Sequence, residues 1–345
     1  MTDQHRPSTV SSGTGGGSAP AGAGRPPVFV AGCGRSGTTY VKVILDASPH
    51  IFIPTESLFI ADYLRHGQVL PPPLARWLFF HEPQLRSWTR ETVSLEHGFA
   101  AAVRLLHERA AKKEGAEYWG QKTPRFIRAM DVFRQAYPGA RFILVYRDPR
   151  AVAASMLRSP AHTYSIGRAC RRWNADSRYI LHYLTAPCES VFLLKYEDLV
   201  LGFSEQVAAL FRFIGIPPLS EGDIVSRGRV REYSGTTAPV AESCIRDGLA
   251  PNPARLDSWK KVLTAGQVRQ IEKTCFATMS RLGYAPVDNA TLKSLPVRPL
   301  VSVRRLLSCV ADVRILLFYL RHWPYYPVHH CLRRTAMTFF ARVHK

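Results

Sequence analysis

Apolar and polar positions divide the middle of the chain into short strand-like runs and longer helix-like segments. The strand-like runs have the length of buried parallel strands and cover residues 28–32, 141–146 and 191–196. The helix-like segments cover residues 38–47, 96–113 and 264–283, and helical sequence also follows the last two strands. This alternation predicts a doubly wound α/β sheet, whose ligands bind at the carboxyl ends of its strands.

The flanking segments differ in composition from this central part. Residues 1–26 are rich in Gly, Ser, Ala and Pro and bury too little surface to offset the entropy of ordering, so we expect a disordered tail. Residues 27–286 form the predicted folded domain, in which residues 216–257 are expected to be irregular loops over the ligand site. Residues 287–345 are expected to form a basic, amphipathic and helical C-terminal extension.

A glycine-rich loop at residues 32–39, GCGRSGTT, joins the first predicted strand to the first predicted helix. Gly34 and Gly37 allow backbone N–H groups to surround one anion, and the following helix adds the positive end of its dipole. A nucleotide triphosphatase loop has a lysine after its last glycine, whereas here Thr38 follows and Arg35 lies inside the loop. Because no Walker B acid is evident either, the loop is predicted to bind a single phosphate or sulfate.

A second anion site is predicted at the strand that ends before Arg147. Asp148 and Pro149 have the sequence of a helix N-cap and first helical residue. Ser155 and Arg158 lie three residues apart and share one face of that helix, so they can converge with Arg147 on one phosphate. In the alternative interpretation, Arg147 pairs with Asp148 or another neighbouring carboxylate and Ser155 only packs.

Both motifs together resemble the sulfotransferases that use 3′-phosphoadenosine 5′-phosphosulfate (PAPS). GRSGTT is similar to their 5′-phosphosulfate loop, in the branch of protein-tyrosine and bacterial small-molecule or carbohydrate enzymes, and RDPR with Ser155 is similar to their 3′-phosphate motif. The resemblance covers roughly residues 27–285. It implies a P-loop-type three-layer α/β/α fold with a mostly parallel sheet. It also implies in-line transfer of a sulfuryl group to an acceptor hydroxyl, with release of adenosine 3′,5′-bisphosphate.

The resemblance also implies roles for individual residues. Glu56 matches the catalytic base, Lys122 in QKTP matches the lysine on the leaving group, and Arg35 acts with the loop on the transferred group. A capping or exposed Glu56 is the alternative, and Asp46 and Glu197 are poorer bases because structural roles suit them. The residues implied in nucleotide binding are Gly34, Arg35, Ser36, Gly37, Thr38, Thr39, Arg147, Ser155, Arg158, Tyr196, Trp259 and Lys260.

Several of these assignments stay open on the sequence alone. Gln121 replaces the glutamate that usually precedes the lysine, which leaves the neighbouring polar network undefined. Glu197 and Asp198 are expected to cap the next helix. Trp259 suits the core as well as a nucleotide, and either Lys260 or Lys261 is the phosphate contact.

The formal charge of +20 and the pI near 10 indicate an anionic partner: a nucleic acid, an acidic membrane or a polyanionic small molecule. The seven cysteines include no C-x-x-C pair, and the N-terminus has no apolar signal core. We therefore expect reduced thiols, a cytoplasmic location and no metal site.

The last 55 residues, 291–345, contain ten Lys or Arg and one acid, Asp312. In one interpretation, this segment forms an amphipathic helix on an anionic membrane, so that the protein attaches peripherally to the inner membrane face. Packing of residues 306–320 on the core or on a second subunit is the other. The acceptor stays open among glycans, lipids, small molecules and tyrosine.

Other classes of protein compete with this interpretation. A P-loop kinase or nucleotidase would need the missing lysine and would turn over magnesium ATP. A nucleic-acid-binding protein would use the charge but lacks a docking motif, so no nucleic-acid partner is expected. A non-catalytic nucleotide-binding scaffold would keep nucleotide affinity without any dependence on Glu56.

Overall fold

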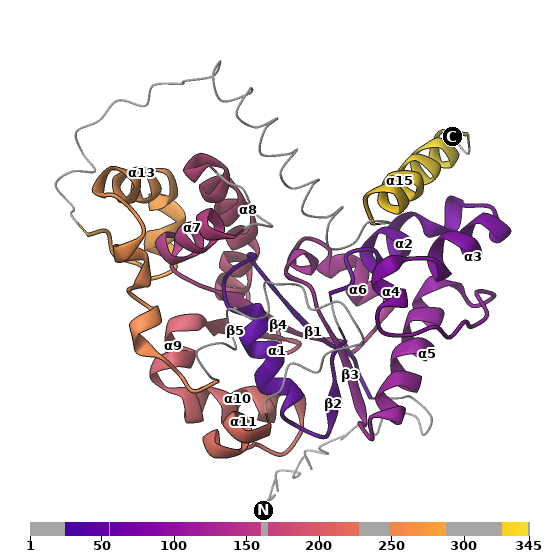
Figure 1. Ribbon diagram of the computed structural model, residues 1–345, viewed down its shortest axis with the longest axis horizontal. Coiled ribbons are helices and arrows are strands. Elements are labelled where there is room, and N and C mark those ends of the chain that lie inside the picture. The colour runs from indigo at the N-terminus through magenta and orange to yellow at the C-terminus, as the bar shows by residue number, and fades with distance from the viewer. Residues whose placement is uncertain (1–24, 55, 160–164, 228–248, 288–325, 344–345) are drawn as a thin grey trace, which may run out of the picture.

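Five parallel strands form the centre of the protein in the computed structural model, which describes residues 25–54, 56–159, 165–227, 249–287 and 326–343. The strand order is β2-β3-β1-β4-β5 (Figure 1). The strands are β1 (Val28–Gly32), β2 (Ile51–Phe52), β3 (Tyr118–Lys122), β4 (Arg141–Tyr146) and β5 (Val191–Lys195). The expected parallel sheet is confirmed.

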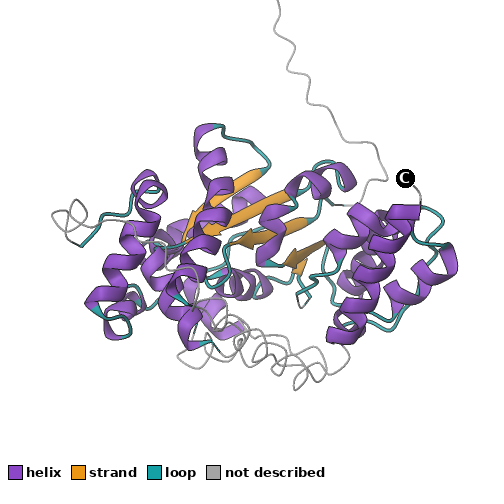
Figure 2. Ribbon diagram, turned by 90° about the horizontal axis from the view of Figure 1, so that it is seen from above, coloured by secondary structure: helices purple, strands orange, loops and turns teal. Residues whose placement is uncertain are grey.

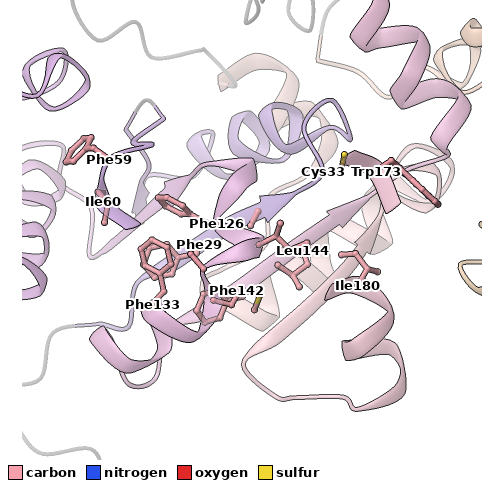
Figure 3. Packing of buried hydrophobic residues seen from close by; sticks show 14 of the residues in the cluster. Phe29, Cys33, Phe59, Ile60, Phe126, Phe133, Phe142, Leu144, Trp173 and Ile180 are labelled. Atoms are coloured by element: carbon pink, nitrogen blue, oxygen red, sulfur yellow. The ribbon is translucent and has the colours of Figure 1, made fainter. Parts of the chain in front are cut away.

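Both faces of the sheet are buried, as the strand β1 illustrates. Val28 and Val30 belong to one buried cluster, whereas Phe29 and Ala31 belong to another on the opposite face. Alternate residues of a strand point to opposite faces, so β1 separates two hydrophobic layers. Phe29 stacks on Phe142 with ring centroids 5.5 Å apart (Figure 3).

Helices cover both faces and make the fold a three-layer α/β/α structure (Figure 2). The face of Val30 packs against α1 (Thr38–Asp46), α9 (Tyr196–Leu201), α10 (Phe203–Ile214) and α11 (Glu221–Arg227). The face of Phe29 packs against α2 (Ile60–His66), α3 (Pro72–Phe80), α4 (Pro83–Arg86), α5 (Gly98–Lys113), α6 (Met130–Ala136), α7 (Pro149–Arg158), α8 (Ile166–Thr185) and α13 (Ala265–Arg281). Short 3₁₀ turns are η1 (Gly67–Val69), η2 (Pro124–Arg128), η3 (Pro253–Arg255) and η4 (Ser258–Lys261).

Most element bounds agree with the hydrophobic pattern. The strands at 28–32 and 141–146 are confirmed, and the third ends one residue early because Tyr196 opens α9. The helix expected over 96–113 begins at Gly98, and the one expected over 38–47 ends at Asp46. The helix expected over 264–283 is α13, with Thr264 and Gln267 forming a reciprocal capping box.

One expectation is wrong. Residues 216–257 are not irregular throughout, because α11 forms where Ser220 Oγ accepts a hydrogen bond of 3.1 Å from the N–H of Asp223. A further helix, α15 (Tyr326–Val343), lies in the basic C-terminal extension and packs beside α4 and η1 (Figure 1). Residues 1–24 of the predicted tail at 1–26, and the whole segment 306–320, lie outside the described residues.

In the described part of the chain, no helix is both long enough and apolar enough to cross a membrane.

Candidate active site

The loop between β1 and α1 turns tightly at Arg35. The N–H of Ser36 donates to Cys33 O at 3.2 Å, and Arg35 has a φ of 73°, in the left-handed region. Gly37 precedes α1 with a φ of 100°, and a Cβ built on it would lie 2.4 Å from the ring of Tyr196. Only glycine fits at position 37, because both the backbone and the ring exclude a side chain.

Arg35 and Ser155 join the two predicted anion motifs, although they lie 120 residues apart. The Nε of Arg35 donates a 3.0 Å hydrogen bond to Ser155 Oγ on α7. Arg158 is exposed at the last turn of the same helix. The two motifs therefore lie at one edge of the sheet, at the carboxyl ends of β1 and β4, as the alternation of strands and helices predicts.

Arg147 lies at the end of β4 with its guanidinium over an aromatic ring. Its Cζ is 4.0 Å from the centroid of Tyr196, and an Nη atom donates to Arg255 O at 3.0 Å. Its Nε is buried without a hydrogen-bond partner among the described residues. The indole of Trp173 donates to Arg147 O at 2.9 Å, which fixes the end of the strand.

The carboxylate beside Arg147 belongs to a structural cluster. Asp148 caps α7 by accepting from the N–H of Arg150 at 2.7 Å, which confirms the predicted cap. The guanidinium of Arg150 pairs with Asp148 and with Glu272, and lies 4.7 Å from the ring centroid of Trp259. The alternative in which Arg147 pairs with Asp148 is therefore not the arrangement seen, and Trp259 packs on this cluster.

Glu197 and Asp198, which were expected to cap α9, lie in the first turn of that helix. Lys195 is the N-cap residue, and the carboxylate of Glu197 accepts hydrogen bonds from the N–H of Asp148 at 3.0 Å and from Tyr284 Oη at 2.9 Å. Burial raises the pKa of Glu197. Asp46 is likewise buried and pairs with Lys42. Both carboxylates have structural partners, as the sequence indicated.

Glu56 and Lys122 form an ion pair at the end of β3. The Nζ of Lys122 donates to Glu56 Oε1 and lies 3.3 Å from Thr39 Oγ1 in the first turn of α1. The pair therefore connects the predicted base, the predicted leaving-group lysine and the glycine-rich loop. Its partners come from three segments that only the folded sheet brings together.

Gln121, which stands where the glutamate is usual, hydrogen-bonds to a neutral histidine. Its Nε2 donates to His107 Nε2 at 2.6 Å, while His107 Nδ1 donates to Val103 O at 2.7 Å. Burial lowers the pKa of His107 to about 4. The polar network behind Lys122 is thus built from uncharged groups.

Other predicted residues lie further from these contacts. Lys260 is exposed and pairs with Asp257 at 2.9 Å, and Lys261 is also exposed. The sequence reasoning missed Arg172 and Asp176 on α8, whose side chains lie beside the loop. Their spacing of four residues indicates a helical ion pair, but no local signal shows which face of α8 meets the loop. Within the described ranges, no group of three or more His, Cys, Asp or Glu side chains is arranged to hold a metal ion.

These contacts define an α/β protein with cationic side chains, Arg35 and Arg147, at the carboxyl ends of β1 and β4, where the two anion sites are predicted. Tyr196 links the sites, because its ring contacts both the Gly37 position and Arg147. An ammonium–carboxylate pair lies beside the first site. The arrangement suits a nucleotide with two separated phosphates and a reacting group next to the glycine-rich loop.

Comparison with known proteins identifies the family. The model of the sulfotransferase family matches residues 26–221, so the chain belongs to that family. Its members transfer a sulfuryl group from PAPS to an acceptor hydroxyl, and this chain is an enzyme of that kind. The expected family, fold and activity are confirmed.

Individual relatives agree with this assignment. Protein-tyrosine sulfotransferase 1 of Danio rerio is 25% identical over 270 residues, covering 76% of this chain and 74% of that protein. Protein-tyrosine sulfotransferase 2 of Gallus gallus is 24% identical, covering 76% and 71%. Among solved structures, the sulfotransferase domain of the Synechococcus PCC 7002 olefin synthase superposes with a TM-score of 0.54 at 18% identity, covering 77% of this chain and 98% of that domain.

Proposed function

We propose that Glu56 is the base and Lys122 the leaving-group cation of sulfuryl transfer from PAPS. The loop of Gly34, Arg35, Ser36, Gly37, Thr38 and Thr39 holds the 5′-phosphosulfate, and Arg147 with Ser155 binds the 3′-phosphate. The ion pair of Glu56 with Lys122, at the edge of the loop, is the observation that carries this proposal.

The reaction needs one bond to form and one to break. The acceptor oxygen attacks sulfur while its proton passes to the carboxylate of Glu56. The bond from sulfur to the bridging oxygen of the 5′-phosphate breaks, and Lys122 and Arg35 stabilise the charge that develops there. Adenosine 3′,5′-bisphosphate leaves with the bonding electrons, so no metal is needed in this scheme.

Two orphaned polar atoms fit this nucleotide. Ser36 Oγ and Arg147 Nε are buried and have no hydrogen-bond partner among the described residues. Buried polar groups are normally paired, so each suits a phosphate oxygen. Arg147 favours PAPS over ATP, which has no 3′-phosphate. The exposed Arg158 and Lys260 serve as outer contacts.

The acceptor is a hydroxyl compound, and protein tyrosine is the first to test because the relatives named above are protein-tyrosine sulfotransferases. A glycan, lipid or small-molecule alcohol is the alternative. We also propose a cytoplasmic protein that attaches peripherally to the anionic inner face of the membrane through its basic C-terminal segment. The exposed Leu332 and Phe339 on α15 support this attachment.

The central experiment separates chemistry from binding. Purified Glu56→Gln and Lys122→Met variants are incubated with ³⁵S-labelled PAPS and a panel of tyrosine peptides, glycans and alcohols. We expect labelled product to form about 10²- to 10⁴-fold more slowly in Glu56→Gln. Its affinity for adenosine 3′,5′-bisphosphate in calorimetry should stay within about twofold of wild type.

Glu189→Gln is the matched control, because Glu189 is exposed in the loop before β5. It should transfer label as wild type does. Full activity of Glu56→Gln would refute the role of Glu56 as the base. Magnesium-dependent ATP turnover by wild type would refute the whole proposal.

A further inference from the structure

The turn of the glycine-rich loop carries backbone strain at Arg35. Cys33, Gly34, Arg35 and Ser36 form a four-residue turn closed by the hydrogen bond from Ser36 N to Cys33 O. Its third residue, Arg35, has a φ of 73°, in the left-handed region that Gly or Asn prefers and that is strained for other residues. Strain of this kind persists only where the surroundings fix the conformation.

We propose that Arg172 of α8 is a positioning residue that holds this turn in its anion-binding conformation. The inference rests on the proposed function, in which the turn binds the 5′-phosphosulfate. Ser155 supports the Arg35 side chain by its 3.0 Å hydrogen bond, and Arg172 supports the backbone one residue earlier.

The guanidinium of Arg172 packs directly against Gly34. An Nη atom lies 2.9 Å, and Cζ 3.4 Å, from the point where a Cβ on Gly34 would be. Any larger residue at position 34 would therefore displace the guanidinium. The side chain of Arg172 is only 15% exposed, so its charge acts on the loop with little screening by solvent.

Asp176, one turn further along α8, orients Arg172. Its buried carboxylate lies 3.8 Å from Arg172 Nε and accepts a hydrogen bond from Arg128 Nε on η2. The thiol of Cys33 also hydrogen-bonds to Asp176, and burial together with this carboxylate raises the pKa of Cys33. Cys33 and Trp173, the residue that follows Arg172, belong to the same buried cluster (Figure 3).

These contacts fix both residues that precede Arg35. Asp176 contacts Cys33, and Arg172 contacts Gly34, so α8 holds the first half of the turn. A preorganised turn binds its anion without a further ordering cost. Loss of Arg172 should therefore weaken ligands that use the loop and spare ligands that do not.

Two nucleotides separate this effect from general damage. Calorimetry compares adenosine 3′,5′-bisphosphate, which reaches both anion sites, with adenosine 3′-monophosphate, which lacks the group bound by the loop. We expect Arg172→Ala to weaken the bisphosphate about tenfold and the monophosphate less than about twofold. Arg172→Lys should recover part of the loss, because it keeps the charge but not the planar fork.

Arg171→Ala is the matched control, since Arg171 is the exposed neighbour on the same helix. It should bind both nucleotides as wild type does. An unchanged bisphosphate affinity in Arg172→Ala, or an equal loss for both nucleotides, would overturn the positioning role. Wild type that does not bind the bisphosphate at all would instead refute the proposed function, and this inference with it.

Discussion

His107 lies buried against two indole rings and beside Gln121 of β3. Its ring centroid is 4.6 Å from those of Trp88 and Trp119, and both of its nitrogens are hydrogen-bonded. Burial lowers its pKa from 6.5 to about 4. The folded protein therefore keeps His107 neutral at pH values where the unfolded chain binds a proton.

This difference predicts a pH dependence of stability. Above pH 6.5 the contribution of neutral His107 to the free energy of unfolding is fully present. As the pH falls from 6.5 towards 4 this contribution is lost, and the loss is about 3 kcal/mol at most. Urea unfolding at pH 7.5 and pH 5 should show a smaller pH-dependent loss of unfolding free energy in His107→Gln than in wild type. The exposed His97→Gln should keep the wild-type dependence. An equal loss of unfolding free energy between pH 7.5 and pH 5 in wild type and His107→Gln would contradict this role of His107.

At the scale of elements, the buried Arg333 links α15 to α2 and α4, in addition to the apolar packing of Met337 on the core. The guanidinium of Arg333 is fully buried, pairs with Glu82 and donates to Asp62 Oδ2 at 2.7 Å. Burial raises the pKa of Glu82 to about 7, even though Arg333 opposes this shift. Breaking such a pair leaves a buried group without compensation.

We therefore expect Arg333→Ala to lower the free energy of unfolding by about 3–5 kcal/mol. Arg334→Ala removes the same charge from the next, exposed position and should change the free energy of unfolding by less than about 0.5 kcal/mol. Urea denaturation followed by tryptophan fluorescence measures both. Equal stability of the two variants would show that α15 does not depend on this pair.

At the scale of the whole molecule, the excess of positive charge predicts attachment to anionic membranes. The exposed side of α15 presents Leu332 and Phe339, which are 51% and 59% exposed, and the helix contains no acidic residue. Basic amphipathic surfaces of this kind bind lipid interfaces. Deleting the segment would also remove Arg333, so point variants give the cleaner test.

Flotation with phosphatidylserine vesicles measures this attachment. Wild type should float with anionic vesicles and be released by high salt, because charge attraction is screened. The double variant Leu332→Ser/Phe339→Ser should lose most of this binding. Phe276→Ser removes a similarly exposed side chain, 44% exposed on α13, and should float as wild type does. Equal flotation of all three proteins would show that α15 does not contribute to membrane binding.

Local sequence was enough to predict the parts of the site that lie in one segment. The glycine-rich loop and the Asp148 cap each depend on neighbouring residues, so their patterns are readable before folding. The alternation of short apolar runs likewise predicted the parallel sheet, because both faces of every strand had to be buried.

Contacts between distant segments could not be predicted in the same way. The ion pair of Glu56 with Lys122 spans 66 residues, and the hydrogen bond of Arg35 with Ser155 spans 120. Arg172 and Asp176 look like an ordinary helical ion pair until α8 is placed beside the loop. The role of Glu197 was also missed in part, since its partner Tyr284 lies 87 residues away.

The ring of Tyr196 has a consequence for redesign of the enzyme. A Cβ at position 37 would lie 2.4 Å from this ring, and the Arg147 guanidinium lies over the ring with Cζ 4.0 Å from its centroid, so both positions depend on the same side chain. A smaller side chain would free room at position 37 but remove the surface on which Arg147 rests. We therefore expect a substitution at Tyr196 to change both the packing at position 37 and the support of Arg147, so a redesign of either position has to take this ring into account.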